Sequence, residues 1–174
     1  MLPSCIQGMK ANKKFIRHTA GIIVAVILYA IWGAFLSDQL KAYKVISRSM
    51  DPTLKVKDHL IISTLDFDPH RSQIITFPDP ETGDPLVKRV IAIEGDKVSI
   101  RNGEVSVNGF LDRNSDIRVE YRDIDVEVED NTVFIMGDNR NNSFDSLDFG
   151  CFPVEKIEGK VLARYFPFNA IRIF

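Results

Sequence analysis

The sequence predicts a mainly β, antiparallel domain joined to one N-terminal transmembrane helix. Three observations lead to this fold class. An uncharged run of 18 residues, 19–36, is long enough for a membrane helix, and the chain beyond it alternates short β-branched runs with turn residues. No amphipathic helix of comparable length stands out in residues 37–174. At 174 residues, the chain has room for one ordinary domain and an appendage.

The apolar run begins at Thr19 and ends at Leu36, and a helix of this length spans about 27 Å, at the short end of what crosses a bilayer core. Tyr29 and Trp32 lie toward its end, as interfacial aromatic residues do. The alternative is a cleaved signal peptide, which needs small residues at the first and third positions before the cut. A cut after Ala34 would put Trp32 at the third position, so we expect an uncleaved anchor.

The charges around the span predict its direction. Four basic residues precede it, whereas Asp38 and Lys41 follow it, so residues 1–18 are expected in the cytoplasm and residues 37–174 outside. Residues 1–38 carry a formal charge of +3 and residues 39–174 carry −5. A large exported domain with that negative charge is a poor nucleic-acid binder.

The β-branched runs beyond the span define the expected strands. Asn102-Gly103 lies between two alternating runs and is the strongest hairpin signal in the chain. The acidic stretch 112–130 ends in an alternation of apolar and acidic residues, which is typical of a strand with one solvated face, so we interpret its charge as surface. The expected strands are Tyr43–Ser47, His59–Ser63, Ile74–Phe77, Leu86–Glu94, Val98–Arg101, Glu104–Val107, Thr132–Met136 and Ile157–Phe166.

Histidine and metal chemistry have little support in the sequence. The three histidines are His18, next to the span, and His59 and His70, which have charged neighbours. The chain has no G-x-S-x-G, no H-E-x-x-H and no paired-cysteine spacing. We therefore expect neither a Ser-His-Asp triad nor a metal site, and a serine nucleophile would need another base.

Lysine can act as that base if an apolar setting lowers its pKa from about 10.4 by several units. Lys88 fits this requirement, because it lies in an expected strand and Leu86, Val90 and Ala92 share its face. The alternative is a lysine that snorkels from an edge strand and keeps its ammonium in water. Ser49, where a strand gives way to a turn, is the candidate nucleophile, and an ordinary polar turn is its alternative.

Three motifs follow one another behind the basic N-terminus and the span. They are S-R-S-M-D-P-T-L (Ser47–Leu54), K-R-V-I-A-I-E-G-D (Lys88–Asp96) and G-D-N-R-N-N-S-F-D-S (Gly137–Ser146). By composition alone, the last would be a structural loop. In this order and spacing, they resemble the bacterial type I signal peptidases. The resemblance implies a β-rich fold, a Ser/Lys dyad at the outer face of the plasma (inner) membrane, and removal of signal peptides from exported preproteins after an Ala-x-Ala-like site.

The resemblance also implies partners and residue roles. The partners are signal-peptide-bearing preproteins and the lipid bilayer, with no metal, no cofactor and no nucleic acid. Ser49 is the nucleophile, Lys88 is the general base, Ser47 supplies a hydroxyl to the oxyanion, Ser143 hydrogen-bonds the lysine, Met50 lines the substrate groove, and Asp138 and Arg140 belong to the supporting loop.

Two positions depart from the family's pattern. Many members have an acidic residue where this chain has Asn141, and an arginine where it has Leu147, so an ion pair from Asp145 to that arginine cannot form. Two alternative functions stay open. One is a peptidase of a conjugation or pilus system that matures one dedicated partner, and the other is a membrane-anchored β scaffold that keeps the motifs as fold residues.

Overall fold

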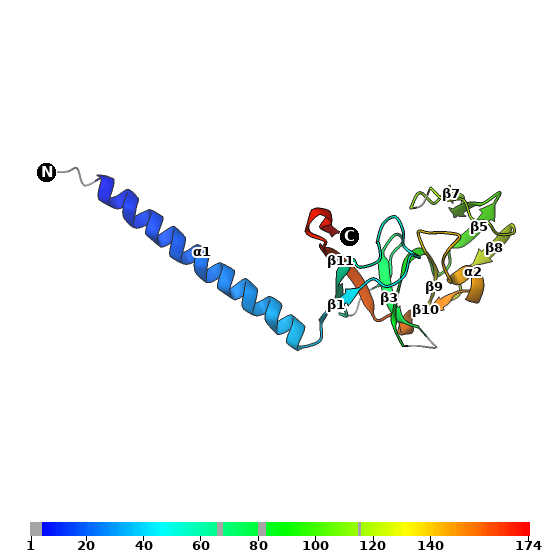
Figure 1. Cartoon of the computed structure of the whole chain (residues 1–174), viewed down its shortest axis with the longest axis horizontal. Helices are drawn as coiled ribbons and strands as arrows, with labels where there is room; N and C mark the ends of the chain where they lie inside the picture. Colours follow the sequence, from blue (N-terminus) through cyan, green and yellow to red (C-terminus); the bar gives the residue numbers. More distant parts are fainter. Residues whose placement is uncertain (1–4, 66–67, 80–82, 115) are drawn as a thin grey trace. The chain divides into compact units, whose positions relative to one another are not determined.

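The computed structural model describes residues 5–65, 68–79, 83–114 and 116–174, and the chain divides into two units, Met1–Leu40 and Lys41–Phe174. Helix α1 (Cys5–Leu36) makes up most of the first unit and is drawn in blue in Figure 1. Its segment Phe15–Leu36 has a mean hydropathy of 2.2, is long and apolar enough to cross a membrane, and has no buried residues. The helix begins well before the expected span 19–36. Residues 1–4 of the expected N-terminal segment 1–18 lie outside the described residues.

The second unit contains two sheets (Figure 1). The larger has eight strands, in the order β1-β2-β11-β3-β4-β9-β10 with β12 on β11, and the smaller has four, in the order β7-β6-β5-β8. Every strand pair from β2 onward is antiparallel, so the predicted fold class is confirmed. The elements are β1 (Leu40–Lys44), β2 (His59–Ser63), β3 (Ile74–Pro78), β4 (Pro85–Ile93), β5 (Lys97–Arg101), β6 (Glu104–Val107), β7 (Phe110–Leu111), β8 (Ile124–Glu127), β9 (Thr132–Met136), α2 (Ser146–Phe149), β10 (Phe152–Pro153), η1 (Val154–Lys156), β11 (Gly159–Phe166), η2 (Phe168–Ala170) and β12 (Arg172–Ile173).

One expected strand is misplaced, and several short elements were missed. The expected strand Tyr43–Ser47 is wrong in its bounds, because β1 ends at Lys44. Beyond it, the buried Val45 exchanges backbone hydrogen bonds of 2.9 Å with Asp58 and Lys57 instead of continuing a strand ladder. The missed strands β7, β10 and β12 have two residues each, which is too short to leave a periodic pattern.

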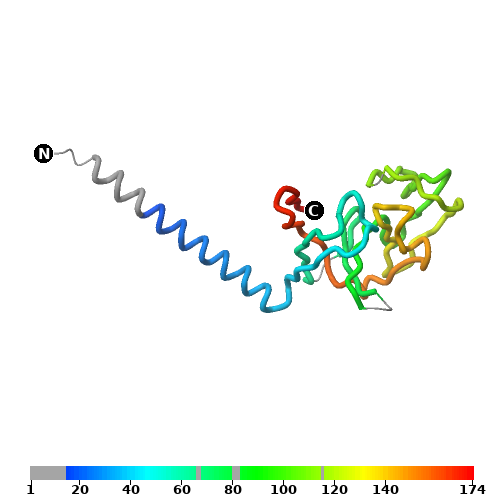
Figure 2. The backbone as a smooth tube through the Cα atoms, viewed as in Figure 1, coloured from blue at the N-terminus to red at the C-terminus, as the bar shows by residue number. Residues whose placement is uncertain are grey.

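The smaller sheet is inserted in the chain between β4 and β9, as the trace in Figure 2 shows. Asn102 and Gly103 have positive φ values of 51° and 78° and form the predicted two-residue turn between β5 and β6. A Cβ at Gly103 would lie 2.8 Å from the carbonyl oxygen of Val119, so this turn also needs glycine for the close approach of a second segment. In β8, half-buried apolar residues alternate with exposed acidic ones, as predicted.

Buried side chains enclose β4 on both faces. Val90 packs with Phe77 of β3 and Ile135 of β9, whereas its neighbour Ile91 packs with the apolar residues of the smaller sheet. A third cluster, which includes Met50, packs the segment after β1 against β2, β3 and β11. Strand β4 and the segment after β1 are therefore both fixed in the core, and these two parts carry the predicted lysine and serine.

Candidate active site

Ser49 lies in a turn that the core holds in place. Its neighbour Met50 is buried in the cluster around β2 and β11, and the Leu54 amide donates to the Met50 carbonyl at 2.9 Å. Ser49 itself is 7% exposed, and its hydroxyl lies 3.2 Å from the Ser47 hydroxyl. The burial of Met50 anchors the turn, so the Ser49 side chain has a fixed position at the edge of the core.

Lys88 lies in the interior of β4, opposite Ile75 of β3. It is 3% exposed, so the alternative in which it snorkels and keeps its ammonium in water is wrong. Burial lowers the pKa of Lys88 from 10.5 to about 8, and the negative charges of Asp145 and Asp148 oppose this shift. A lysine with this pKa has a substantial neutral fraction near pH 8, which is the form that can accept a proton.

A loop after β9, residues 137–145, connects these two parts, and we call it the catalytic loop. The backbone N–H of Asn139 donates to the Ser49 carbonyl at 2.9 Å, and the Asn139 side-chain amide donates to the Arg48 carbonyl at 3.1 Å. At the other end of the loop, Asp145 is close enough to Lys88 to oppose the fall of the lysine pKa. The catalytic loop therefore contacts the serine backbone and supplies charge near the lysine.

The catalytic loop also approaches the serine turn at Gly137. Its N–H donates to Asp145 Oδ2 at 2.9 Å. A Cβ at this position would overlap both the Ser143 hydroxyl and the Ser49 carbonyl oxygen, so only glycine fits without displacing one of them. The motif contains Gly137, but no local pattern assigns it a role, because the close approach comes from segments far apart in the chain.

Asp145 has other partners in place of the arginine that this chain lacks. It caps α2 by accepting from the Leu147 N–H at 3.2 Å, and the Asp145 N–H donates to the Asp148 carboxylate at 2.9 Å. Burial raises the pKa of Asp145, and its interactions with the Ser143 side chain and with the Gly137 and Leu147 N–H groups oppose that rise. This end of the loop is therefore fixed by backbone donors.

Arg89, which the sequence analysis did not single out, forms a buried ion pair beside Lys88. Its Nε and one terminal nitrogen donate to the two carboxylate oxygens of Asp138 at 2.8 and 2.7 Å, and its other terminal nitrogen donates to the Ser72 carbonyl at 2.7 Å. The signal was present in the sequence. An arginine beside a buried lysine, in a strand covered on both faces, requires a buried carboxylate.

The other predicted residues have varied surroundings. Met50 is in the core, and its role in a substrate groove stays a prediction. The Ser143 hydroxyl is buried, and its interaction with Asp145 lowers the pKa of that carboxyl, whereas no hydrogen bond from it to Lys88 is found among the described residues, so its bond to the lysine stays a prediction. Arg140 forms a buried ion pair with Asp112. Among the described residues, no group of three or more His, Cys, Asp or Glu side chains could hold a metal ion.

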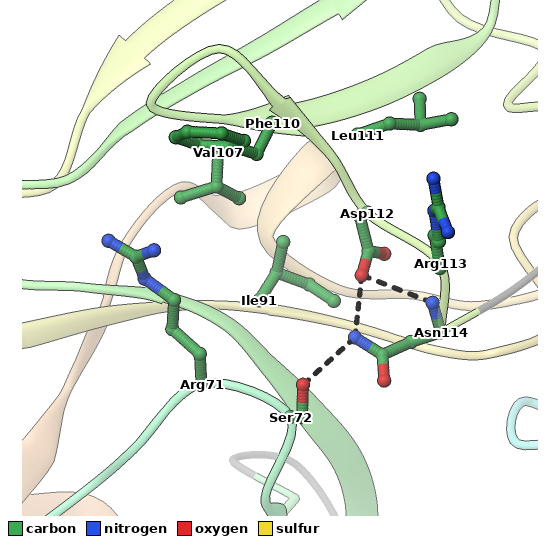
Figure 3. Close-up of a pocket in the computed structure, with 9 residues that line it drawn as sticks. All are labelled: Arg71, Ser72, Ile91, Val107, Phe110, Leu111, Asp112, Arg113 and Asn114. Atoms are coloured by element: carbon green, nitrogen blue, oxygen red, sulfur yellow. Dashed lines mark hydrogen bonds between the residues drawn. The ribbon is translucent and has the colours of Figure 1, made fainter.

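The surface also has a cavity of about 320 Å³ that none of these predicted site residues lines (Figure 3). Ile91 and Val107 are among its apolar residues, and Arg71 and Asn114 are among its polar ones. In Figure 3, the Asn114 amide is bonded to the Ser72 hydroxyl and to the Asp112 carboxylate. This cavity therefore lies beside the partners of Arg89 and Arg140.

Comparisons with known proteins show which family this chain resembles. A family model described as "Signal peptidase, peptidase S26" matches residues 15–166. "Probable signal peptidase I-2" of Synechocystis sp. is 36% identical over 159 residues, which cover 84% of this chain and 71% of the relative. "Signal peptidase I" of Bacillus amyloliquefaciens is 34% identical over 167 residues, covering 87% of this chain and 88% of the relative. A crystal structure of a signal peptidase I from Enterococcus faecalis aligns with a TM-score of 0.46, at 26% identity, over 54% of this chain and 97% of that chain.

The family match and the similar relatives show that this chain is a peptidase. Its N-terminal helix has the length and composition of a membrane anchor. The chain belongs to the signal peptidase family and is an enzyme of the signal peptidase I type.

Proposed function

We propose that this chain is a membrane-anchored endopeptidase that removes signal peptides from exported preproteins with a Ser49–Lys88 dyad. One observation carries the proposal. Lys88 is buried in β4 with a pKa lowered to about 8, and the catalytic loop that contacts the Ser49 backbone also carries Asp145, the negative charge that acts most strongly on that lysine. A serine without a usable histidine needs a base of this kind.

The chemistry follows from the two side chains. Neutral Lys88 takes the proton from the Ser49 hydroxyl as the serine oxygen bonds to the carbonyl carbon of the scissile peptide. The Ser49 N–H and the Ser47 hydroxyl stabilise the oxyanion. The Lys88 ammonium then protonates the departing amine as the C–N bond breaks. Lys88 finally removes a proton from the water that hydrolyses the acyl-enzyme.

The substrate would bind as an added strand on β4. Strand β9 pairs with β4 only from Arg89 onward, so the same edge of β4 has no described strand partner between Pro85 and Lys88. A peptide on this edge would place alternate side chains toward the enzyme, which suits small residues one and three positions before the cut.

The N-terminal helix α1 would keep the reaction at the membrane. We place residues 1–18 in the cytoplasm, residues 19–36 across the plasma membrane, and the catalytic domain, residues 37–174, on the outer side. Basic residues before the span support this direction. Preproteins whose apolar segment is still in the bilayer would then meet the enzyme in two dimensions, which raises their effective concentration.

Activity should depend on pH through the base. Because the neutral form of Lys88 is the active one and its pKa is about 8, kcat/KM should fall about tenfold for each pH unit below 8. Cleavage of a purified precursor between pH 5.5 and 9.5 measures this slope. His59→Gln and His70→Gln should leave the profile unchanged, and a midpoint near 6.5 that disappears in either variant would contradict the lysine assignment.

The function is tested with the full chain in phospholipid vesicles. We expect it to cut several unrelated exported precursors after Ala-x-Ala, with the new N-terminus identified by mass spectrometry, and we expect Ser49→Ala to cut none. Cleavage of a single precursor from the panel would favour the dedicated conjugation or pilus peptidase. A wild-type chain that cuts no better than Ser49→Ala would favour the non-catalytic scaffold.

A further inference from the structure

A segment that connects two strands of the smaller sheet lies against the catalytic loop. It follows β7 and precedes β8, and we call its residues 112–114 and 116–121 the connector. The Asn141 side chain of the loop donates to the Arg118 carbonyl at 2.9 Å and accepts from the Glu120 N–H at 2.7 Å. The Tyr121 hydroxyl donates to the Leu147 carbonyl at 3.1 Å. One amide thus bonds the connector backbone through both its donor and its acceptor.

The strongest of these contacts is the ion pair between Arg140 of the loop and Asp112 of the connector. The side chains of Arg140 and Asp112 are 2% and 6% exposed. Asp112 is the only acidic partner found for Arg140 in the described part of the chain, and Arg140 Nε has no hydrogen-bond partner there. Removing the carboxylate would leave a buried guanidinium without compensation.

The connector itself is fixed to the smaller sheet. The Val119 N–H donates to the Gly103 carbonyl at 2.8 Å, and the Val119 side chain is buried in the cluster that joins the two sheets. The Arg118 guanidinium donates to the Asn102 carbonyl at 2.9 Å and to Glu104 at 2.7 Å. Because these contacts fix the connector to the smaller sheet, the connector can restrain the catalytic loop that it contacts.

A second route links the connector to the catalytic loop through the cavity of Figure 3. Asp112 accepts from Asn114, the Asn114 amide donates to the Ser72 hydroxyl at 3.2 Å, and the Ser72 carbonyl accepts from Arg89. Arg89 in turn forms an ion pair with Asp138 of the catalytic loop, two residues before Arg140. The connector is therefore linked to the catalytic loop by two routes, one direct, at Arg140, and one through Ser72 and Arg89, at Asp138.

From these contacts, we infer that the connector positions the catalytic loop for catalysis, with Asp112 as the principal positioning residue and Asn141 as the second. The inference rests on the proposed function. The loop touches the Ser49 backbone and the surroundings of Lys88 but has no described backbone hydrogen bond to residues 85–88 of β4, so we expect a loosened loop to slow the chemical steps and leave substrate binding unchanged.

Asp112→Asn is compared with Asp96→Asn. Asp96 is also a buried carboxylate of this region, paired with Arg71, but its described partners lie outside the catalytic loop. Both variants should lower the melting temperature by a similar amount, about 5–10 °C. Asp112→Asn should also lower kcat about tenfold or more with KM within about twofold, whereas Asp96→Asn should change kcat by less than about twofold. Equal kcat values for the two variants would overturn the inference.

Asn141→Asp tests the same inference without a risk to folding, because Asn141 is exposed. The carboxylate keeps the acceptor for Glu120 but faces the Arg118 carbonyl, so we expect kcat to fall about threefold to tenfold at constant KM. Asn169→Asp adds the same charge at an exposed position outside the catalytic loop and should stay within about twofold of wild type. Equal loss in both would overturn the positioning role. Wild-type activity that survives Ser49→Ala would instead overturn the proposed function.

Discussion

Replacing Lys88 by methionine is expected to lower kcat about 10³-fold or more while the protein stays folded. Methionine fills a similar volume and cannot accept a proton, so the change removes the base and keeps the packing between β3 and β9. Single-turnover cleavage of a precursor in vesicles measures the loss. KM should change little, because Lys88 acts on the proton of Ser49.

The same variant should be more stable than the wild type at pH 7. A pKa lowered from 10.5 to about 8 means that the folded state pays for burying the ammonium below pH 8, by at most about 3 kcal/mol. Between pH 8 and 10.5, the unfolded chain binds more protons, so wild-type stability should rise with pH across this window. Lys88→Met should gain about 1–3 kcal/mol at pH 7 and lack that rise.

Urea unfolding of both proteins at pH 7 and pH 10 measures these expected differences in the free energy of unfolding. Lys88→Arg serves as the control, since arginine keeps a charge at both pH values and should be inactive and less stable. A Lys88→Met protein that is inactive but also strongly destabilised would show that the lysine supports the fold. A protein that keeps more than about a tenth of wild-type activity would contradict its role as the base.

Much of this fold could be predicted because its signals are local. The apolar run 19–36 lies within α1, and the strands His59–Ser63, Glu104–Val107 and Thr132–Met136 have the predicted bounds. The turn at Asn102-Gly103 is predicted from these two residues and the runs on either side of them. The burial of Lys88 could also be predicted, since its neighbours in the strand are apolar.

The features that were missed depend on contacts between distant segments. Asp138 lies 49 residues after Arg89, and Asp112 lies 28 residues before Arg140. Neither pairing leaves a local pattern, and both carboxylates lie in stretches whose composition is that of surface loops. Asp145 is fixed without the missing arginine by the backbone N–H groups of Gly137 and Leu147, and backbone donors leave no pattern in the sequence.

Gly137→Ala should be the most damaging change outside the dyad. The added methyl group would overlap the Ser143 hydroxyl and the Ser49 carbonyl oxygen. The second of these is backbone, so relief requires the loop and the serine turn to separate, and a displacement of about 1 Å between reacting groups can cost about 10²-fold in rate. We expect kcat to fall about 10²-fold or more, as measured by precursor cleavage at pH 9, where Lys88 is mostly neutral.

Gly159→Ala is the matched control for this prediction. A Cβ there would also overlap backbone, the Ser63 carbonyl oxygen, but between β2 and β11. Both variants should lose stability, and only Gly137→Ala should lose kcat in excess of its folded fraction, which circular dichroism under the assay conditions determines. If the two variants lose activity only in proportion to unfolding, the contact of Gly137 with Ser49 serves the fold alone and the catalytic loop tolerates displacement.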